Sequence, residues 1–135
     1  MRFIVYGRPY GKARPRRGKF MIYNPKQNYE YEDKVRKAYL AAENAPREPT
    51  EDAIWINVTL VFPIPKSTPK KKREAMLEGK AFPLIRPDVD NCLKSIMDGL
   101  NGLAYRDDKQ VVLTRTEKKY GEKAMTIIDI GRYYR

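Results

Sequence analysis

The sequence predicts an α+β fold in which helices pack on a mixed β-sheet. Residues 53–62 alternate apolar and polar side chains with the period of a strand, and residues 88–101 repeat apolar side chains with the period of a helix. Two more strand patterns follow at residues 111–120 and 124–130. With 135 residues and no internal repeat, the chain is expected to form one domain spanning residues 1–135.

The N-terminal part of the chain is expected to supply a strand, a basic loop and a helix. Residues 2–7 have a strand pattern, and prolines, glycines and clustered positive charge predict a loop or irregular hairpin over residues 8–20. Residues 21–23 are a candidate short strand. A helix is then expected over residues 27–42, where apolar side chains recur on one side.

The middle of the chain is expected to hold the central strand and a short basic helix. The linker at residues 46–52 leads into residues 53–62, whose alternation favours a strand inside the sheet. Thr68 is expected to cap and Pro69 to begin a helix that Gly79 ends.

The third predicted helix has one apolar face and one polar face. At roughly 100° per residue, the apolar stripe contains Val89, Cys92, Leu93, Ile96, Met97 and Leu100. The opposite side carries Asp90, Asn91, Lys94 and Asp98. One face is therefore expected to build core, and the other is free for chemistry. Asp98 is expected to pair with Asn101 or with basic neighbours.

Charge and cysteine content restrict the function. Lys and Arg number 28 against 17 Asp and Glu, a net charge of +11 that favours a polyanionic partner such as nucleic acid. The chain has one cysteine and no histidine, so an internal disulfide, a Cys/His zinc site and a histidine-based triad are excluded. Cys92 is expected to be a buried apolar residue. No membrane span or signal segment is predicted, and a cytoplasmic location is expected.

Acidic residues gather at the start of the third predicted helix. Asp88 occupies the N-cap position, so capping is one explanation for it. An i,i+4 salt bridge to Lys94 would explain Asp90, but neither explanation covers the later doublet Asp107–Asp108. Clustered carboxylates repel one another, and a hard divalent cation usually offsets that cost. With only oxygen ligands offered, Mg²⁺ is expected, with Mn²⁺ as a substitute.

A basic protein with a small acidic patch is typical of metal-dependent phosphodiester cleavage on DNA or RNA. Residues 87–102 and 107–111 strengthen this interpretation, since PDVDNCLKSIMDGLNG followed by DDKQV resembles the RusA family of Holliday-junction resolvases. KARPR at 12–16, PKS at 65–67 and EKKY at 117–120 resemble the longer members of that family, so the likeness covers most of the chain.

The resemblance implies a set of site residues. Asp88, Asp90 and Asp108 would be the metal-binding catalytic carboxylates, and Lys94 would be the essential lysine, orienting Asp90 or contacting the scissile phosphate. Asp107 could orient Asp108 or share the metal. The three carboxylates are expected to converge on a common Mg²⁺.

The resemblance also implies a RusA-like homodimer, bacterial or prophage-encoded, acting in DNA recombination and repair. Such a dimer binds four-way DNA junctions by shape and makes paired nicks in opposed strands. A two-fold protein suits this task because it places two identical sites against a two-fold substrate.

Two basic segments are candidates for contact with DNA phosphates. The first, a basic arm, consists of Lys12, Arg14, Arg16, Arg17 and Lys19. The second consists of Lys70, Lys71, Lys72 and Arg73, and Arg86 adds a further charge beside the acids. A charge run is often only a solvated face, but the acidic patch nearby favours DNA contact.

Two alternatives remain from the sequence. One is a catalytically silent junction- or RNA-binding module on the same scaffold. The other is a structural protein whose acids form salt bridges with its own arginines.

Overall fold

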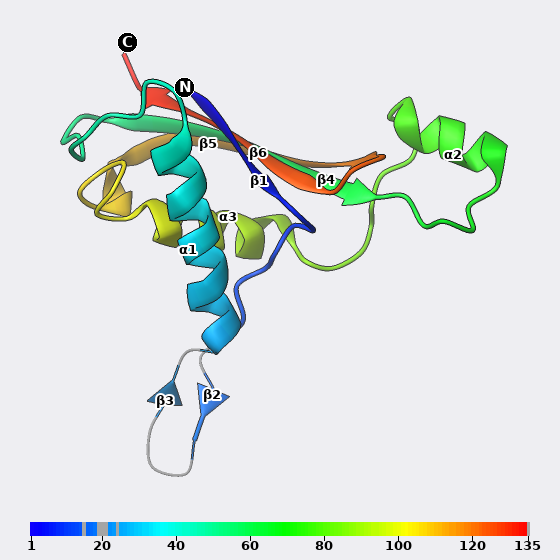
Figure 1. The fold of residues 1–135 in the computed structure, drawn as a ribbon, viewed down its shortest axis with the longest axis horizontal. Helices are drawn as coiled ribbons and strands as arrows, with labels where there is room; N and C mark the ends of the chain where they lie inside the picture. The colour runs from blue at the N-terminus through cyan, green and yellow to red at the C-terminus, as the bar shows by residue number, and fades with distance from the viewer. Residues whose placement is uncertain (15, 19–21, 24, 135) are drawn as a thin grey trace.

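The chain folds into a four-stranded mixed sheet with three α-helices over the described residues (Figure 1). The computed structural model describes residues 1–14, 16–18, 22–23 and 25–134. The strands are β1 (Arg2–Tyr6), β2 (Arg16–Arg17), β3 (Ile22–Tyr23), β4 (Ile54–Pro63), β5 (Val111–Gly121) and β6 (Met125–Arg132). The helices are α1 (Lys26–Ala41), α2 (Lys70–Leu77), α3 (Val89–Leu100) and the 3₁₀ helix η1 (Asp108–Gln110). The predicted α+β class is confirmed.

The sheet has the order β1-β6-β4-β5, and β4 lies in its interior as predicted. β4 runs antiparallel to β6 and parallel to β5. A parallel pair needs a long crossover between its strands. Here the crossover is the chain from residue 64 to residue 110, which carries α2 and α3. β1 closes one edge against β6, and β5 forms the other edge.

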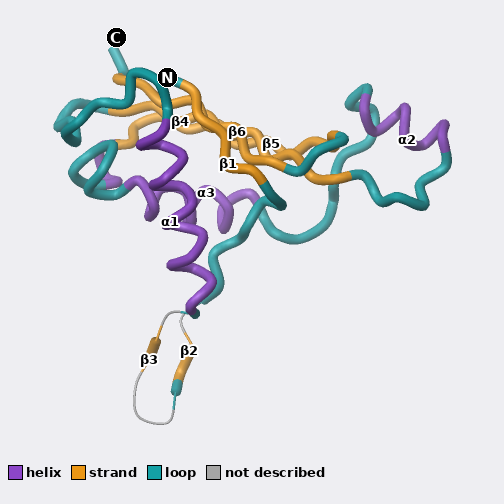
Figure 2. The backbone as a smooth tube through the Cα atoms, viewed as in Figure 1, coloured by secondary structure: helices purple, strands orange, loops and turns teal. Residues whose placement is uncertain are grey.

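The core lies between the sheet and the helices α1 and α3, which lie on the same side of it (Figure 2). β4 contributes the alternate residues Ile54, Ile56, Val58, Leu60 and Phe62 to this core, all buried as their alternation predicts. Each side chain buried in this way contributes roughly 1.5–3 kcal/mol. Over the described part of the chain, no helix covers the other face of the sheet, where Trp55, Asn57 and Thr59 are partly exposed.

Both α1 and α2 begin directly after a proline. For α2 this corrects the prediction that Thr68 caps the helix and Pro69 begins it. Pro69 is the N-cap of α2, with ψ of 151°, so the helix starts at Lys70 and Thr68 makes no capping hydrogen bond. An extended ψ at proline keeps that residue outside the helix. Thr68 is then one residue too early to cap. Pro25 begins α1 in the same way, with ψ of 141°.

α2 belongs to an excursion, residues 64–85, that stands away from the body of the molecule (Figure 2). The short ribbon of β2 and β3 projects elsewhere, from the N-terminal end of α1 (Figure 1). Among the described residues, no helix combines the length and the hydropathy that a membrane crossing requires.

Candidate active site at the mouth of α3

The N-terminal end of α3 presents two carboxylates to solvent. Burial of Cys92, Ile96 and Leu100 against the core turns the opposite side of the helix outward, and both Asp88 and Asp90 are exposed. Asp88 occupies the predicted N-cap position, with φ of −73° and ψ of 154°, yet its side chain makes no capping hydrogen bond. Capping therefore does not account for Asp88 in this structure.

Residues 11–14, where the basic arm begins, lie at this helix mouth. Gly11, Arg14, Arg86, Pro87, Asp88 and Asn91 line a hollow of about 470 Å³. The arm lies so close that a Cβ on Gly11 would lie 2.5 Å from the Cβ of Pro87. The Lys12 amide donates to the Asn91 carbonyl at 3.1 Å. Two arginines and an aspartate thus border one hollow of a size that admits a phosphate group.

Asn28, in the first turn of α1, holds the base of the arm. It is 0% exposed, and its Oδ1 accepts from the Ala13 amide at 2.9 Å and from the Tyr10 hydroxyl at 2.6 Å. Its Nδ2 donates to the Ala13 carbonyl at 2.9 Å. Asn28 was not among the predicted site residues. Polar residues are common near the start of a helix, so the sequence does not indicate that this one bonds to a distant segment.

Lys94 pairs with Asp98, one turn further along α3. Its Nζ lies 3.4 Å from Oδ1 of Asp98, while the side chain stays 60% exposed. The second oxygen of Asp98 accepts from Nζ of Lys12. The expectation that Asp98 pairs with basic neighbours is confirmed. Asp90 and Asp98 each lie one helical turn from Lys94, and Asp98 forms the ion pair. The suggestion that Lys94 orients Asp90 is therefore not supported by a bond between them.

Lys12 is a structural link as well as a member of the basic arm. Burial opposes its charge, but the hydrogen bond and the charge of Asp98 outweigh that effect and raise its pKa. Glu32 of α1 lies nearby, and burial, assisted by the charge of Asp98, raises the pKa of its carboxyl group. Lys12 is therefore committed to an internal ion pair between the arm and α3.

The other predicted DNA contacts lie in different surroundings. Arg14, Arg17 and Arg86 are exposed. Arg16 lies in β2, and Lys19 falls outside the described residues. On α2, Lys70, Lys71 and Lys72 are exposed and Arg73 is partly exposed.

The second acidic element is the doublet before β5. Asp107 caps η1, and its Oδ1 accepts from the Lys109 amide at 2.9 Å. That hydrogen bond lowers the pKa of Asp107. Asp107 thus has a local structural role. The side chain of Asp108 takes no part in the cap.

Gln110 clamps the doublet in place. Its Oε1 accepts from the amides of Arg106 and Asp107, and its Nε2 donates to the carbonyls of Thr50 and Asp52, each at 2.9 Å. Four hydrogen bonds from one side chain tie the doublet to the segment that precedes β4. The sequence showed this glutamine only as a letter of the DDKQV motif.

The two acidic elements lie at opposite ends of α3. Asp107 and Asp108 lie near Tyr105, whose hydroxyl donates to the carbonyl of Met97 at 2.6 Å. Burial raises the pKa of Tyr105, and these carboxylates add to the effect. From Asp90 to the end of the helix the axis rises about 15 Å. In Figure 1 the helix separates the loop before it from the loop that leads into β5.

One expectation is therefore wrong as stated. Within the described part of the chain, no three Asp, Glu or Cys side chains lie close enough together to hold a metal ion. Asp88 and Asp90 are neighbours, but Asp108 does not join them within one chain. The residues themselves are present and accessible, and only their convergence in a single chain fails.

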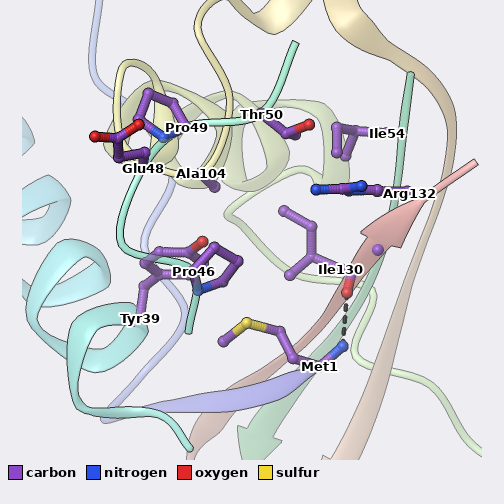
Figure 3. Close-up of a pocket in the computed structure, with 11 residues that line it drawn as sticks. Met1, Tyr39, Pro46, Glu48, Pro49, Thr50, Ile54, Ala104, Ile130 and Arg132 are labelled. Atoms are coloured by element: carbon purple, nitrogen blue, oxygen red, sulfur yellow. Dashed lines mark hydrogen bonds between the residues drawn. The ribbon is translucent and has the colours of Figure 1, made fainter. Parts of the chain in front are cut away.

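A second hollow, of about 280 Å³, lies at the far end of the sheet (Figure 3). Its walls are mainly apolar, with Tyr39, Ile54 and Ile130 among them. The amino group of Met1 donates to the Ile130 carbonyl at 2.7 Å. This hollow lacks the paired carboxylates of the α3 mouth.

Comparison with known proteins relates the chain to a family and to a bacterial relative. The family described as Endodeoxyribonuclease RusA matches residues 6–131. A relative called "Uncharacterized protein YqaN", from Bacillus subtilis (strain 168), is 35% identical over 129 residues, which cover 91% of this chain and 89% of the relative.

Cys92 is predicted to be unreactive in the folded protein. It is buried, and burial raises its pKa to about 11. At pH 8 only about one thiol in a thousand would be ionised. Iodoacetamide at pH 8 should therefore leave native Cys92 unmodified by mass spectrometry, whereas the urea-unfolded chain should react completely. Rapid native labelling would contradict the burial of this thiol.

Replacing Gln110 by alanine is predicted to destabilise the fold. The change removes four partly exposed hydrogen bonds and should cost about 1–3 kcal/mol in the free energy of unfolding, measured by urea titration. Gln27→Ala, at an exposed site on α1, is the matched control and should change stability by less than about 0.5 kcal/mol. Equal stability of the two variants would refute the clamp.

Proposed function

The chain belongs to the RusA endodeoxyribonuclease family, and on that premise we propose that it is a divalent-metal-dependent nuclease that cuts four-way DNA junctions as a homodimer. One observation carries the proposal. Asp88 and Asp90 lie exposed at a helix mouth. Asp88 makes no capping hydrogen bond, and it borders one hollow with Arg14 and Arg86. Carboxylates kept free next to arginines suit a site that receives a phosphodiester.

The donor chemistry fits Mg²⁺ or Mn²⁺. Asp88, Asp90 and Asp108 offer only carboxylate oxygens, which hard cations prefer, and the chain has no histidine. A divalent cation held by these residues would supply Lewis-acid stabilisation of the charge that develops on the phosphate. The helix mouth has a second advantage, because the positive end of the α3 dipole lies beside it.

The basic residues have separate tasks in this proposal. Arg14 and Arg86 bind the DNA backbone at the hollow and neutralise its charge. Lys94 remains 60% exposed while Asp98 holds it, so its ammonium group can approach the scissile phosphate and stabilise the transition state. Binding that depends on such contacts should weaken steeply with salt.

The proposed dimer completes the metal site. A two-fold axis perpendicular to α3 places the N-terminal end of one helix opposite the C-terminal end of its partner's. Asp88 and Asp90 of one chain then face the acidic doublet of the other. The edge strand β5 supports such an interface, since Val112 and Leu113 are exposed apolar residues near its start.

A second function, junction binding without cutting, is favoured by the separation of Asp108 from Asp88 and Asp90 within one chain. A chain that stays monomeric offers only Asp88 and Asp90 at the helix mouth. It would bind DNA through its basic surface but lack the third carboxylate.

Replacing Asp90 by asparagine is predicted to abolish cutting and to preserve binding, because the change removes a metal ligand and a negative charge from an exposed site. A synthetic four-way junction with and without Mg²⁺, and a linear duplex, provide the assay, with band shifts for binding. Asp33→Asn, on the exposed side of α1, is the control and should cut normally. Cutting by Asp90→Asn at the normal rate would refute the role of Asp90.

Mixing two inactive variants is predicted to restore nicking. If each site uses Asp90 of one chain and Asp108 of the other, a dimer of Asp90→Asn with Asp108→Asn has one intact site and one doubly defective site. Refolding the two variants together should give about a quarter of the wild-type sites. The products should be singly nicked junctions. If the mixture stays as inactive as its components, the site does not cross the dimer axis.

A further inference from the structure

The segment that joins α2 to α3 carries an exposed apolar ridge, defined as Phe82, Leu84 and Ile85. Leu84 is 91% exposed, more than any other large apolar side chain of the described residues, and Phe82 and Ile85 are also exposed. These three exposed apolar side chains lie within four residues of the sequence, and apolar groups gathered in this way mark interaction sites more often than isolated apolar residues do.

The ridge is held in a fixed position. Pro83, between Phe82 and Leu84, is buried and anchors the chain against the protein. Its neighbours Phe82 and Leu84 are exposed. Nζ of Lys118, on β5, donates to the carbonyl of Ile85 and lies 5.3 Å from the centre of the Phe62 ring. A ridge whose chain is held at Pro83 and at Ile85 loses little conformational freedom when it binds.

The charge of the excursion indicates what the ridge meets. Residues 64–85 contain six basic and two acidic residues, with Lys70, Lys71 and Lys72 exposed on α2. The chain as a whole has a net charge of +11, so docking of this excursion on a second copy would bring like charges together. A polyanion suits it better. Among polyanions, one with accessible apolar faces is required, and nucleic-acid bases provide those faces.

The ridge also lies next to the candidate active site. Leu84 precedes Asp88 by four residues, a distance of at most about 14 Å along the chain. Successive nucleotides of one strand are spaced by about 3.4 Å. The ridge can therefore reach bases within about four nucleotides of a phosphate held at the α3 mouth.

We propose that Phe82, Leu84 and Ile85 form a wedge that packs against unstacked bases at the branch point of junction DNA. Apolar side chains inserted between base steps unstack them and bend the helix. A branch point already has interrupted stacking, so the cost of insertion is lower there than in a continuous duplex. The ridge thus gives the basic surface, which binds any DNA backbone, a preference for branched DNA. This inference rests on the proposed function for its substrate.

The test uses a synthetic four-way junction with 2-aminopurine at the branch point, because the fluorescence of this base rises when it unstacks. In EDTA the wild-type protein should raise the fluorescence at saturation. The double variant Phe82→Ser/Leu84→Ser should lose most of this rise and roughly tenfold of the preference for junction over duplex. Leu84→Trp, which enlarges the stacking surface at an exposed site, should retain the rise. Leu40→Ser, an equally simple change at an exposed leucine of α1, should behave as wild type.

Parallel reactions in Mg²⁺ separate this inference from the nuclease proposal. If the wild-type protein cuts the junction without any change in fluorescence, the wedge is refuted and the nuclease stands. If it raises the fluorescence through the ridge but never cuts, the nuclease is refuted and the wedge stands. If the double variant sediments as a monomer where the wild-type protein is a dimer, the ridge belongs to an interface between copies and the wedge is refuted.

Discussion

The burial of one face of α3 between the sheet and α1 determines both the core and the candidate site. Cys92, Ile96 and Leu100 point into the core, and the same rotation of the helix points Asp90 and Lys94 outward. A slip of one residue would turn the helix by about 100° and carry charged groups into the core. Burial of an unpaired carboxylate costs several kcal/mol, so the alternative registers are strongly disfavoured. The position of the acids is thus a consequence of apolar packing.

Electrostatic pairing then attaches the basic arm to this helix. In a chain with an excess of eleven positive charges, Asp98 interacts with two lysines at once, Lys12 from the arm and Lys94 from α3. The Lys12–Asp98 pair is partly buried, so solvent screens it less than the exposed pairs on α1. Together with Asn28, it holds the start of the arm over the helix mouth. Arg14 of the arm consequently borders the same hollow as Asp88.

The sequence predicted the parts of this molecule that depend on periodic burial. The alternation of β4 and the bounds of α1 to within one residue agree with the structure, because each pattern has one buried side. The two faces of α3 agree as well, except that Val89 of the predicted apolar stripe is exposed, since it lies in the first turn beyond the edge of the core. Interactions between distant residues were not predictable. The four bonds of Gln110 depend on where the segment before β4 runs, and the bond of Lys118 depends on the crossover. The convergence of Asp108 with Asp88 and Asp90 in one chain was predicted wrongly. Spacing along the sequence does not show at which end of α3 the later loop, which carries Asp108, lies.

The separation of the acids along α3 has a physical consequence for the proposed function. If one chain carried all three carboxylates at one place, a monomer could cut any DNA that its basic surface bound. When the carboxylates lie at opposite ends of a helix, only an antiparallel partner brings them together, and two-fold symmetry then creates both sites at once. The three acidic ligands would also repel one another least in the free chain and meet only where a cation can offset their charge. The length of α3 would then make cutting depend on dimer formation, and it would couple the cut in one strand to the cut in the opposed strand.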